Sequence, residues 1–142
     1  MIVYLDTSVV LRHVLNQGQR LDQWGRWDEA YASELLGVEA RRAFDRLRLS
    51  GALDDMSVAQ AHDELALVER ALGQIALTRP VLQRAAMPMP TILKTLDALH
   101  LASAMLFRET REERLVFASH DEQQGRAARA LGFSVIGIAN ET

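Results

Sequence analysis

Four acidic residues stand at positions where a globular chain needs apolar side chains. Asp6 and Asp121 each follow a short apolar run, whereas Glu39 and Asp97 lie inside apolar helical patterns. An ionised carboxylate is costly to bury unless it is paired or binds a metal. Carboxylates that are brought together also repel one another, and without a cation some of them must take up protons. If the fold makes these acids converge, they therefore indicate a divalent-metal site.

Short apolar runs alternate with helical patterns along the whole chain, which predicts an α/β domain with a mainly parallel sheet. The predicted strands cover residues 1–5, 31–33, 75–77, 115–118 and 134–138. The predicted helices cover residues 9–15, 34–49, 57–72, 81–86, 95–108 and 122–131, and residues 16–28 are expected to form a loop or a short helix. There is no linker, so residues 1–142 are expected to form a single domain.

Several helix boundaries can be predicted from capping residues. Ser57 and Gln60 have the spacing of a capping box at the start of one helix. Gly73 is expected to end that helix. Thr95 is expected to cap the long apolar helix that follows it, and Pro80 fits the first turn of a shorter one.

The predicted fold brings the four acids to one edge of the sheet. Sites in parallel α/β sheets form at the carboxyl ends of the strands, where Asp6 and Asp121 are expected to lie. Asp97 falls in the first turn of its helix, where the positive end of the helix dipole favours a carboxylate. Glu39 lies one turn inside another helix. One opening can therefore collect all four carboxylates.

Each acid also has an ordinary structural interpretation. Asp6 and Asp121 are good N-cap residues for the helices that follow them. Asp97 is acceptable in any first helical turn, and Glu39 can pair with Arg42, three residues further along a solvated face. Taken singly these alternatives are strong, but together they leave the common location of the acids unexplained.

Histidine and tryptophan give weaker indications. His100, within an apolar helix, is expected to be a satisfied core or packing residue rather than a ligand, and His120 is expected at the surface. Trp24 and Trp27 can stack on nucleic-acid bases, but packing on the core or on a partner is the simpler expectation.

Composition limits the possible classes of protein. The net charge is −3, which argues against a broadly basic surface that coats nucleic acid. Lys94 is the only lysine among 16 basic residues, and the arginines suit local phosphate contacts. The chain contains no cysteine, which excludes disulfides and thiolate metal sites. No signal peptide or membrane span is apparent, so we expect a cytoplasmic protein.

Carboxylate oxygens are the ligands that Mg²⁺ and Mn²⁺ prefer in proteins. A bound ion makes its water more acidic, and such water can attack a phosphodiester. Whether one ion or two would bind is left open by the sequence.

Each acid stands in a short motif, and the motifs follow one another in order. The most specific is Leu96-Asp97-Ala98-Leu99-His100-Leu101-Ala102. The other segments are 4–8 around Asp6, 33–43 around Glu39, 117–121 ending at Asp121, and 127–132. Together they span almost the whole chain and resemble the PIN-domain family, in particular the VapC-type toxins of bacterial toxin–antitoxin pairs.

This resemblance implies a three-layer α/β/α sandwich and an endoribonuclease that depends on Mg²⁺ or Mn²⁺. Asp6, Glu39, Asp97 and Asp121 would be its catalytic and metal-binding residues. Ser8 and Ser119 are candidate substrate contacts, and Ser119 stands where the family usually has threonine. The expected partners are RNA, a small antitoxin protein that inhibits the active site, and a second copy in a homodimer.

Other classes of protein remain possible from the residues. A housekeeping RNA-processing nuclease would have the same acidic motifs. A haloacid-dehalogenase-like phosphohydrolase would use Asp6 as a nucleophile, but it needs a second aspartate where this chain has Ser8. A non-catalytic interaction module would have no reason to keep all four acids.

Overall fold

A parallel sheet forms the centre of the molecule, which we describe from a computed structural model for residues 1–139. The strand order is β3-β2-β1-β4-β5, and each pair of neighbouring strands is parallel. The strands are β1 (Ile2–Leu5), β2 (Glu29–Ser33), β3 (Gly73–Ile75), β4 (Leu115–Ala118) and β5 (Ser134–Ile136). The predicted α/β class with a mainly parallel sheet is confirmed.

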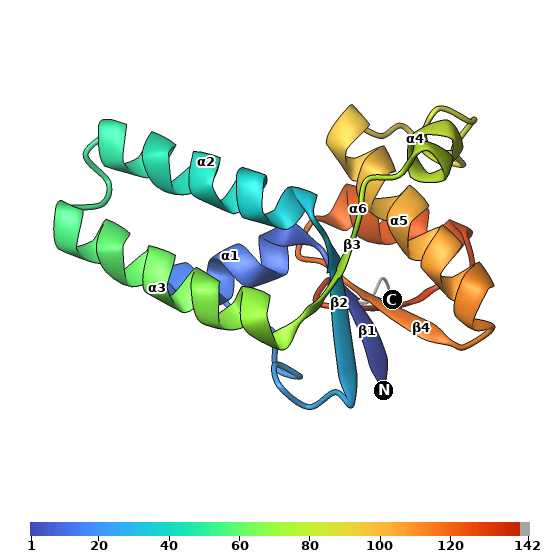
Figure 1. Cartoon of the computed structure of the whole chain (residues 1–142), viewed down its shortest axis with the longest axis horizontal. Helices are drawn as coiled ribbons and strands as arrows, with labels where there is room; N and C mark the ends of the chain where they lie inside the picture. Colours follow the sequence, from blue (N-terminus) through green and yellow to red (C-terminus); the bar gives the residue numbers. More distant parts are fainter. Residues whose placement is uncertain (140–142) are drawn as a thin grey trace.

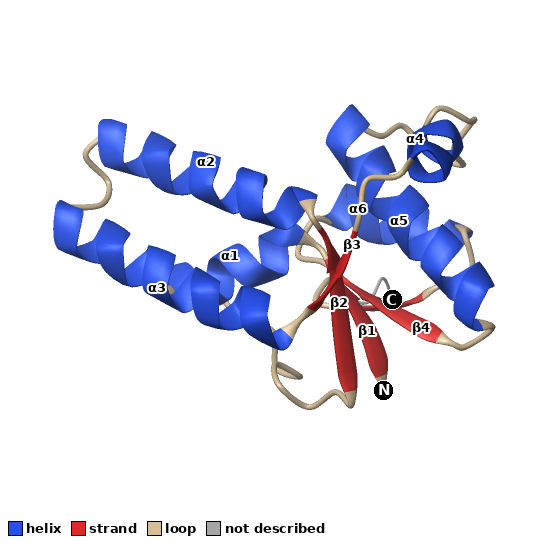
Figure 2. Cartoon of the chain, in the orientation of Figure 1, coloured by secondary structure: helices blue, strands red, loops and turns tan. Residues whose placement is uncertain are grey.

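Helices cover both faces of this sheet (Figures 1 and 2). On one face, α1 (Thr7–Leu15), α2 (Leu35–Leu49) and α3 (Asp55–Ala71) contact one another. On the other face lie α5 (Thr95–Arg111) and α6 (Glu122–Ala130), with the short α4 (Arg79–Ala85) packed on α5. This arrangement is the α/β/α sandwich that the resemblance implied. None of the helices in residues 1–139 is long and apolar enough to span a membrane.

The central strand explains why the first apolar run does not alternate with polar residues. Val3 and Leu5 belong to the core beneath α1, α2 and α3, whereas Tyr4 belongs to the core beneath α5 and α6. All three side chains are fully buried. A strand that is covered by helices on both faces needs apolar residues at every position.

The helices α2 and α3 extend side by side away from the sheet (Figure 1). An ion pair between Arg41 and Glu69, with a nitrogen–oxygen distance of 2.7 Å, links them. At the far end the chain turns through Gly51, whose φ of +80° favours glycine.

Three predicted boundaries are wrong for local reasons. The helix predicted to begin with a capping box at Ser57 starts earlier, because the side chain of Asp54 accepts a hydrogen bond from the Ser57 backbone N–H. Gly73 does not end this helix but begins β3. Thr95 is the first residue of α5 rather than its cap, since the extended residue Lys94 holds the cap position.

The last strand is shorter than predicted because of Gly137. Its φ of +97° ends the strand at Ile136. A Cβ atom at Gly137 would lie 2.4 Å from the Ser119 carbonyl oxygen. The close approach of these two backbones requires glycine, and it fixes the chain beside the end of β4.

Candidate active site

The direction in which the chain crosses the sheet reverses between β1 and β4. From β1 the chain proceeds to β2 and β3 on one side, and it later returns to β4 and β5 on the other. Such a switch point leaves a crevice at the carboxyl ends of the two strands. The Asp6 backbone N–H donates to the Ala118 carbonyl at 2.9 Å, so the two strands stay paired up to this crevice.

Asp6 is directed into the crevice and not onto its helix. It holds the N-cap position of α1, but its side chain accepts no hydrogen bond from the helix backbone. Instead its carboxylate accepts hydrogen bonds from the hydroxyl groups of Ser8, at 2.6 Å, and Ser119, at 3.1 Å. The interpretation of Asp6 as a simple helix cap is therefore wrong. The two hydroxyls fix an acid that is only 6% exposed.

Glu39 is held by residues from two other helices. Its Oε1 accepts a hydrogen bond from Thr7 Oγ1 at 2.9 Å and lies 2.5 Å from His100 Nε2. Burial raises the pKa of Glu39, but His100 and Thr7 outweigh that effect and hold it below its usual value. Arg42, the alternative partner, pairs with Asp45 at 3.0 Å. The solvated-face interpretation of Glu39 is therefore wrong.

His100 is the residue of this centre that the sequence did not reveal. It is 1% exposed, and its Nδ1 is hydrogen-bonded to the Tyr4 hydroxyl at 2.7 Å. Its Nε2 also lies 3.8 Å from Asp6 Oδ1. Burial alone would lower the pKa of His100, but the neighbouring carboxylates raise it above its usual value. Its spacing of three residues from Asp97 places both on one helix face, which is the signal that could have identified it.

Asp97 carries the least compensated charge of the four acids. Its carboxylate accepts no hydrogen bond from any residue in the range 1–139, although it lies in the first turn of α5. Burial raises the pKa of Asp97, and the negative charges of Asp6, Asp121 and Glu39 raise it further. The structure therefore brings the four predicted acids within electrostatic reach of one another.

Asp121 combines the two interpretations that the sequence allowed. One of its carboxylate oxygens caps α6 by accepting the Gln124 backbone N–H at 2.9 Å. The other oxygen receives no hydrogen bond from the described residues. The N-cap interpretation is confirmed, and it leaves half of the carboxylate available to the crevice.

Ser8 and Ser119 tie the loop after β4 to Asp6. Besides donating to Asp6, the Ser8 hydroxyl accepts from the His120 backbone N–H and the Ser119 hydroxyl from the Asp121 backbone N–H, each at 3.0 Å. Both hydroxyls are thus part of the scaffold, and their predicted contact with substrate stays a prediction. Gln124, which is fully buried, donates from Nε2 to the Asp97 carbonyl at 3.1 Å.

The aromatic residues of the 16–28 loop pack inward. Trp24 stacks on His13 with a centroid distance of 3.8 Å and meets Trp27 edge-on at 5.1 Å. Both tryptophans pack against the core beneath α1. The packing expected for them is confirmed.

The side chains at the crevice offer the kind of ligand atoms that a hard cation prefers. It consists of carboxylate and hydroxyl oxygens, and the chain has no cysteine that would select a softer metal. The negative charges of Asp6, Asp121 and Glu39 disfavour the ionised form of Asp97, and a bound cation would offset these charges. Within residues 1–139, no three of the His, Asp and Glu side chains are already arranged to hold an ion together. A cation that keeps several of its waters needs only a few direct protein ligands.

Comparisons with known proteins bear on the resemblance that the sequence motifs carry. The chain matches no family model. It is 27% identical to Ribonuclease VapC47 of Mycobacterium tuberculosis in an alignment 139 positions long that covers 93% of this chain and 93% of that protein. Among solved structures it is similar to a toxin–antitoxin complex from Klebsiella pneumoniae, with a TM-score of 0.62 and 15% identity over 97% of this chain and 96% of that one. It is also similar to VapBC2 from Rickettsia felis bound to a promoter DNA fragment, with a TM-score of 0.61 and 10% identity over 95% and 97% of the two chains. The resemblance of this chain to the VapC-type proteins of the PIN-domain family is therefore confirmed along almost its whole length.

Proposed function

We propose that this chain is a metal-dependent endoribonuclease that acts as the toxin of a toxin–antitoxin pair. The observation that carries the proposal is the meeting of four carboxylates at the switch point, where burial and then the charges of the other three raise the pKa of Asp97. The related protein VapC47 is named a ribonuclease, and similar folds occur in toxin–antitoxin complexes. The acids, the relative and the fold support the same activity.

The proposed metal is Mg²⁺ or Mn²⁺, which Asp6, Glu39, Asp97 and Asp121 would hold between them. When bound, such an ion makes a water molecule acidic enough to attack a phosphodiester. Hydrogen bonds from neighbouring side chains hold two of these carboxylates in position. Ser8 and Ser119 orient Asp6, whereas Thr7 and His100 orient Glu39.

Asp97 is the one of the four acids whose carboxylate accepts no hydrogen bond from residues 1–139, and burial and the charges of the other three acids raise its pKa. We therefore assign it the central contact with the cation. Asp121 is anchored by its capping oxygen, and it would contribute its second oxygen directly or through water.

An antitoxin partner fits the surface of α2 and α3. These helices expose several large apolar side chains, namely Val38, Leu49, Met56 and Leu67, each at least half exposed. An amphipathic helix of the antitoxin would pack on them, and a basic residue in its tail would enter the acidic crevice in place of the metal. The homodimer that the resemblance implies is likewise part of the proposal, and light scattering of the purified protein tests it.

The nuclease proposal is tested with mixed RNA and a generic phosphate ester as parallel substrates. The purified chain should cleave RNA with Mg²⁺ or Mn²⁺, should lose this activity in excess EDTA, and should leave the ester intact. RNA cleavage that persists in EDTA would refute the metal requirement. Hydrolysis of the ester alone would favour the phosphohydrolase.

The toxin proposal is tested by co-expression with the protein encoded by the neighbouring gene. A toxin should co-purify with that protein and should arrest growth when expressed alone. Neutralising the basic tail residue of the partner should weaken inhibition while the complex survives. If nothing co-purifies and the chain is harmless while it cleaves RNA, a housekeeping RNA-processing nuclease is the better account.

A further inference from the structure

Two glutamines in the first turn of α6 donate hydrogen bonds to the segment that carries Asp97. Gln123 Nε2 donates to the Ile92 carbonyl at 2.7 Å, and Gln124 Nε2 donates to the Asp97 carbonyl at 3.1 Å. Because a carbonyl oxygen can only accept, the atom that each glutamine presents is its amide nitrogen. Gln123 is exposed, whereas Gln124 is fully buried. Side chains of α6 therefore fasten the start of α5.

Gln124 is bonded to two of the four acids at once. Its backbone N–H donates to Asp121 Oδ1 at 2.9 Å, while its side chain reaches the Asp97 backbone. Asp121 and Asp97 belong to the starts of two different helices. A single buried residue thus sets how these two acids lie relative to each other.

Asp97 needs a contact of this kind. Its carboxylate accepts no hydrogen bond from residues 1–139, and the neighbouring carboxylates repel it. Repulsion among the acids favours their separation, and it acts directly on the first turn of α5. Within the part of the chain that the structure describes, Gln124 is the one residue whose side chain forms a hydrogen bond with Asp97.

Stability alone does not account for a buried amide at position 124. Its Oε1 is buried and has no hydrogen-bond partner among residues 1–139, which costs free energy. The Asp97 carbonyl lies inside α5, where the N–H of Leu101, four residues further on, already bonds to it. An unbranched apolar side chain such as methionine would therefore suit the packing at least as well. What the amide adds is its hydrogen bond to Asp97.

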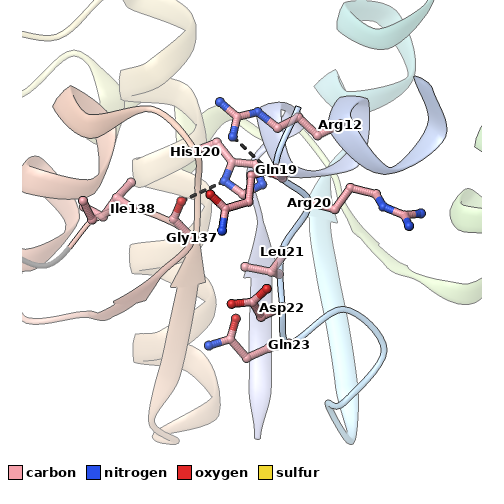
Figure 3. Close-up of a pocket in the computed structure, with 10 residues that line it drawn as sticks. Arg12, Gln19, Arg20, Leu21, Asp22, Gln23, His120, Gly137 and Ile138 are labelled. Atoms are coloured by element: carbon pink, nitrogen blue, oxygen red, sulfur yellow. Dashed lines mark hydrogen bonds between the residues drawn. The ribbon is translucent and has the colours of Figure 1, made fainter. Parts of the chain in front are cut away.

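The start of α6 is itself fixed to the sheet, so that it can hold Asp97 in place. The His120 ring donates from Nδ1 to the Gly137 carbonyl at 2.7 Å (Figure 3). The His120 backbone N–H donates to the Ser8 hydroxyl at 3.0 Å. One turn into α6, a Cβ atom at Gly125 would lie 2.4 Å from Ile138 Cδ1, so the helix packs closely on the chain after β5.

We propose that Gln124 is a positioning residue that holds Asp97 beside Asp121 for a divalent cation that both acids would bind. It touches neither the ion nor the substrate, and it acts through the backbone of Asp97. This inference rests on the proposed function, and it adds to that function a residue that determines how tightly the acidic centre binds its metal.

Mn²⁺ binding, measured by titration calorimetry without RNA, tests this role independently of activity. Gln124→Met keeps an unbranched side chain of similar length and removes the amide. Gln123→Met is the matched control, because it makes the same change at the neighbouring residue and breaks the bond to Ile92 but not the bond to Asp97. Gln124→Leu is a second apolar variant, for the case that methionine does not pack.

Gln124→Met should bind Mn²⁺ about tenfold more weakly, the smaller of the losses that follow when a group that orients a metal ligand is removed. Half-maximal RNA cleavage should need correspondingly more Mg²⁺, whereas the rate at saturating Mg²⁺ should approach that of the wild type. The urea midpoint without metal should stay close to the wild-type value. Gln123→Met should change none of these quantities. A purely structural role would instead lower the urea midpoint and reduce the rate at every Mg²⁺ concentration.

The inference and the proposed function fail in distinguishable ways. Suppose that the wild type binds Mn²⁺ and cleaves RNA. The positioning role is then wrong, while the nuclease proposal stands, if Gln124→Met binds Mn²⁺ like the wild type or no more weakly than Gln123→Met. The same holds if circular dichroism shows both Gln124 variants to be unfolded. If the wild type neither binds Mn²⁺ nor cleaves RNA, the proposed function fails and the inference fails with it.

Discussion

Replacing Tyr4 by phenylalanine should destabilise the protein by about 1–3 kcal/mol, although it removes a single oxygen atom. That oxygen forms the 2.7 Å hydrogen bond to Nδ1 of His100, and both residues are almost completely buried. Phenylalanine would keep the stacking on Phe117, whose ring centroid lies 5.2 Å away. The cost is therefore that of leaving a buried imidazole nitrogen without a partner. Urea unfolding of the two proteins measures it.

Tyr31→Phe is the matched control for this prediction. The Tyr31 hydroxyl accepts from Arg111 at 3.1 Å in an exposed setting, where water can replace the lost bond. Its removal should change the free energy of unfolding by no more than about 0.5 kcal/mol. Equal effects of Tyr4→Phe and Tyr31→Phe would refute the claim that His100 is held by a buried hydrogen bond.

Two further predictions concern the repelling acids and the glycine at the end of β5. Because the pKa of Asp97 is raised in the folded protein, its ionisation opposes folding above that pKa. Asp97→Asn should therefore raise the urea midpoint of the metal-free protein at neutral pH, and the gain should vanish as the pH falls towards about 4. A lower midpoint at neutral pH would contradict the claim that burial and the neighbouring carboxylates destabilise the ionised form of Asp97. Gly137→Ala should lower the melting temperature much more than Gly51→Ala, because both glycines have positive φ but only Gly137 would place its Cβ against the Ser119 carbonyl, 2.4 Å away. Equal losses would show that this backbone contact is unimportant.

The fold was predictable because its signals are local and repeated. The buried run 115–118 and the apolar pattern of α5 each specify an element without reference to the rest of the chain. Helix starts were less predictable, because several capping residues compete at each of them. Asp54 displaced the expected Ser57, since its side chain reaches the Ser57 N–H from outside the helix.

The acids of the site were predictable, but the groups that hold them were not. Strand ends and helix starts place Asp6 and Asp97 at one edge of the sheet. The contact of Glu39 with His100, by contrast, joins residues 61 positions apart, and no local pattern in the chain encodes it. The local alternative, a pair with Arg42, was lost because Asp45 lies on the same exposed helix face and binds that arginine.

The rate of RNA cleavage by the wild type, Asp97→Asn and Asp63→Asn, each with Mg²⁺ and with EDTA, tests the central claim most directly. Asp63→Asn is the matched control, because it removes the same charge from an exposed position on α3. Cleavage should require Mg²⁺, should fall by more than about 100-fold in Asp97→Asn, and should be unchanged in Asp63→Asn. A folded Asp97→Asn protein that cleaves RNA at the wild-type rate would contradict the claim that the converging carboxylates form a metal-dependent nuclease centre.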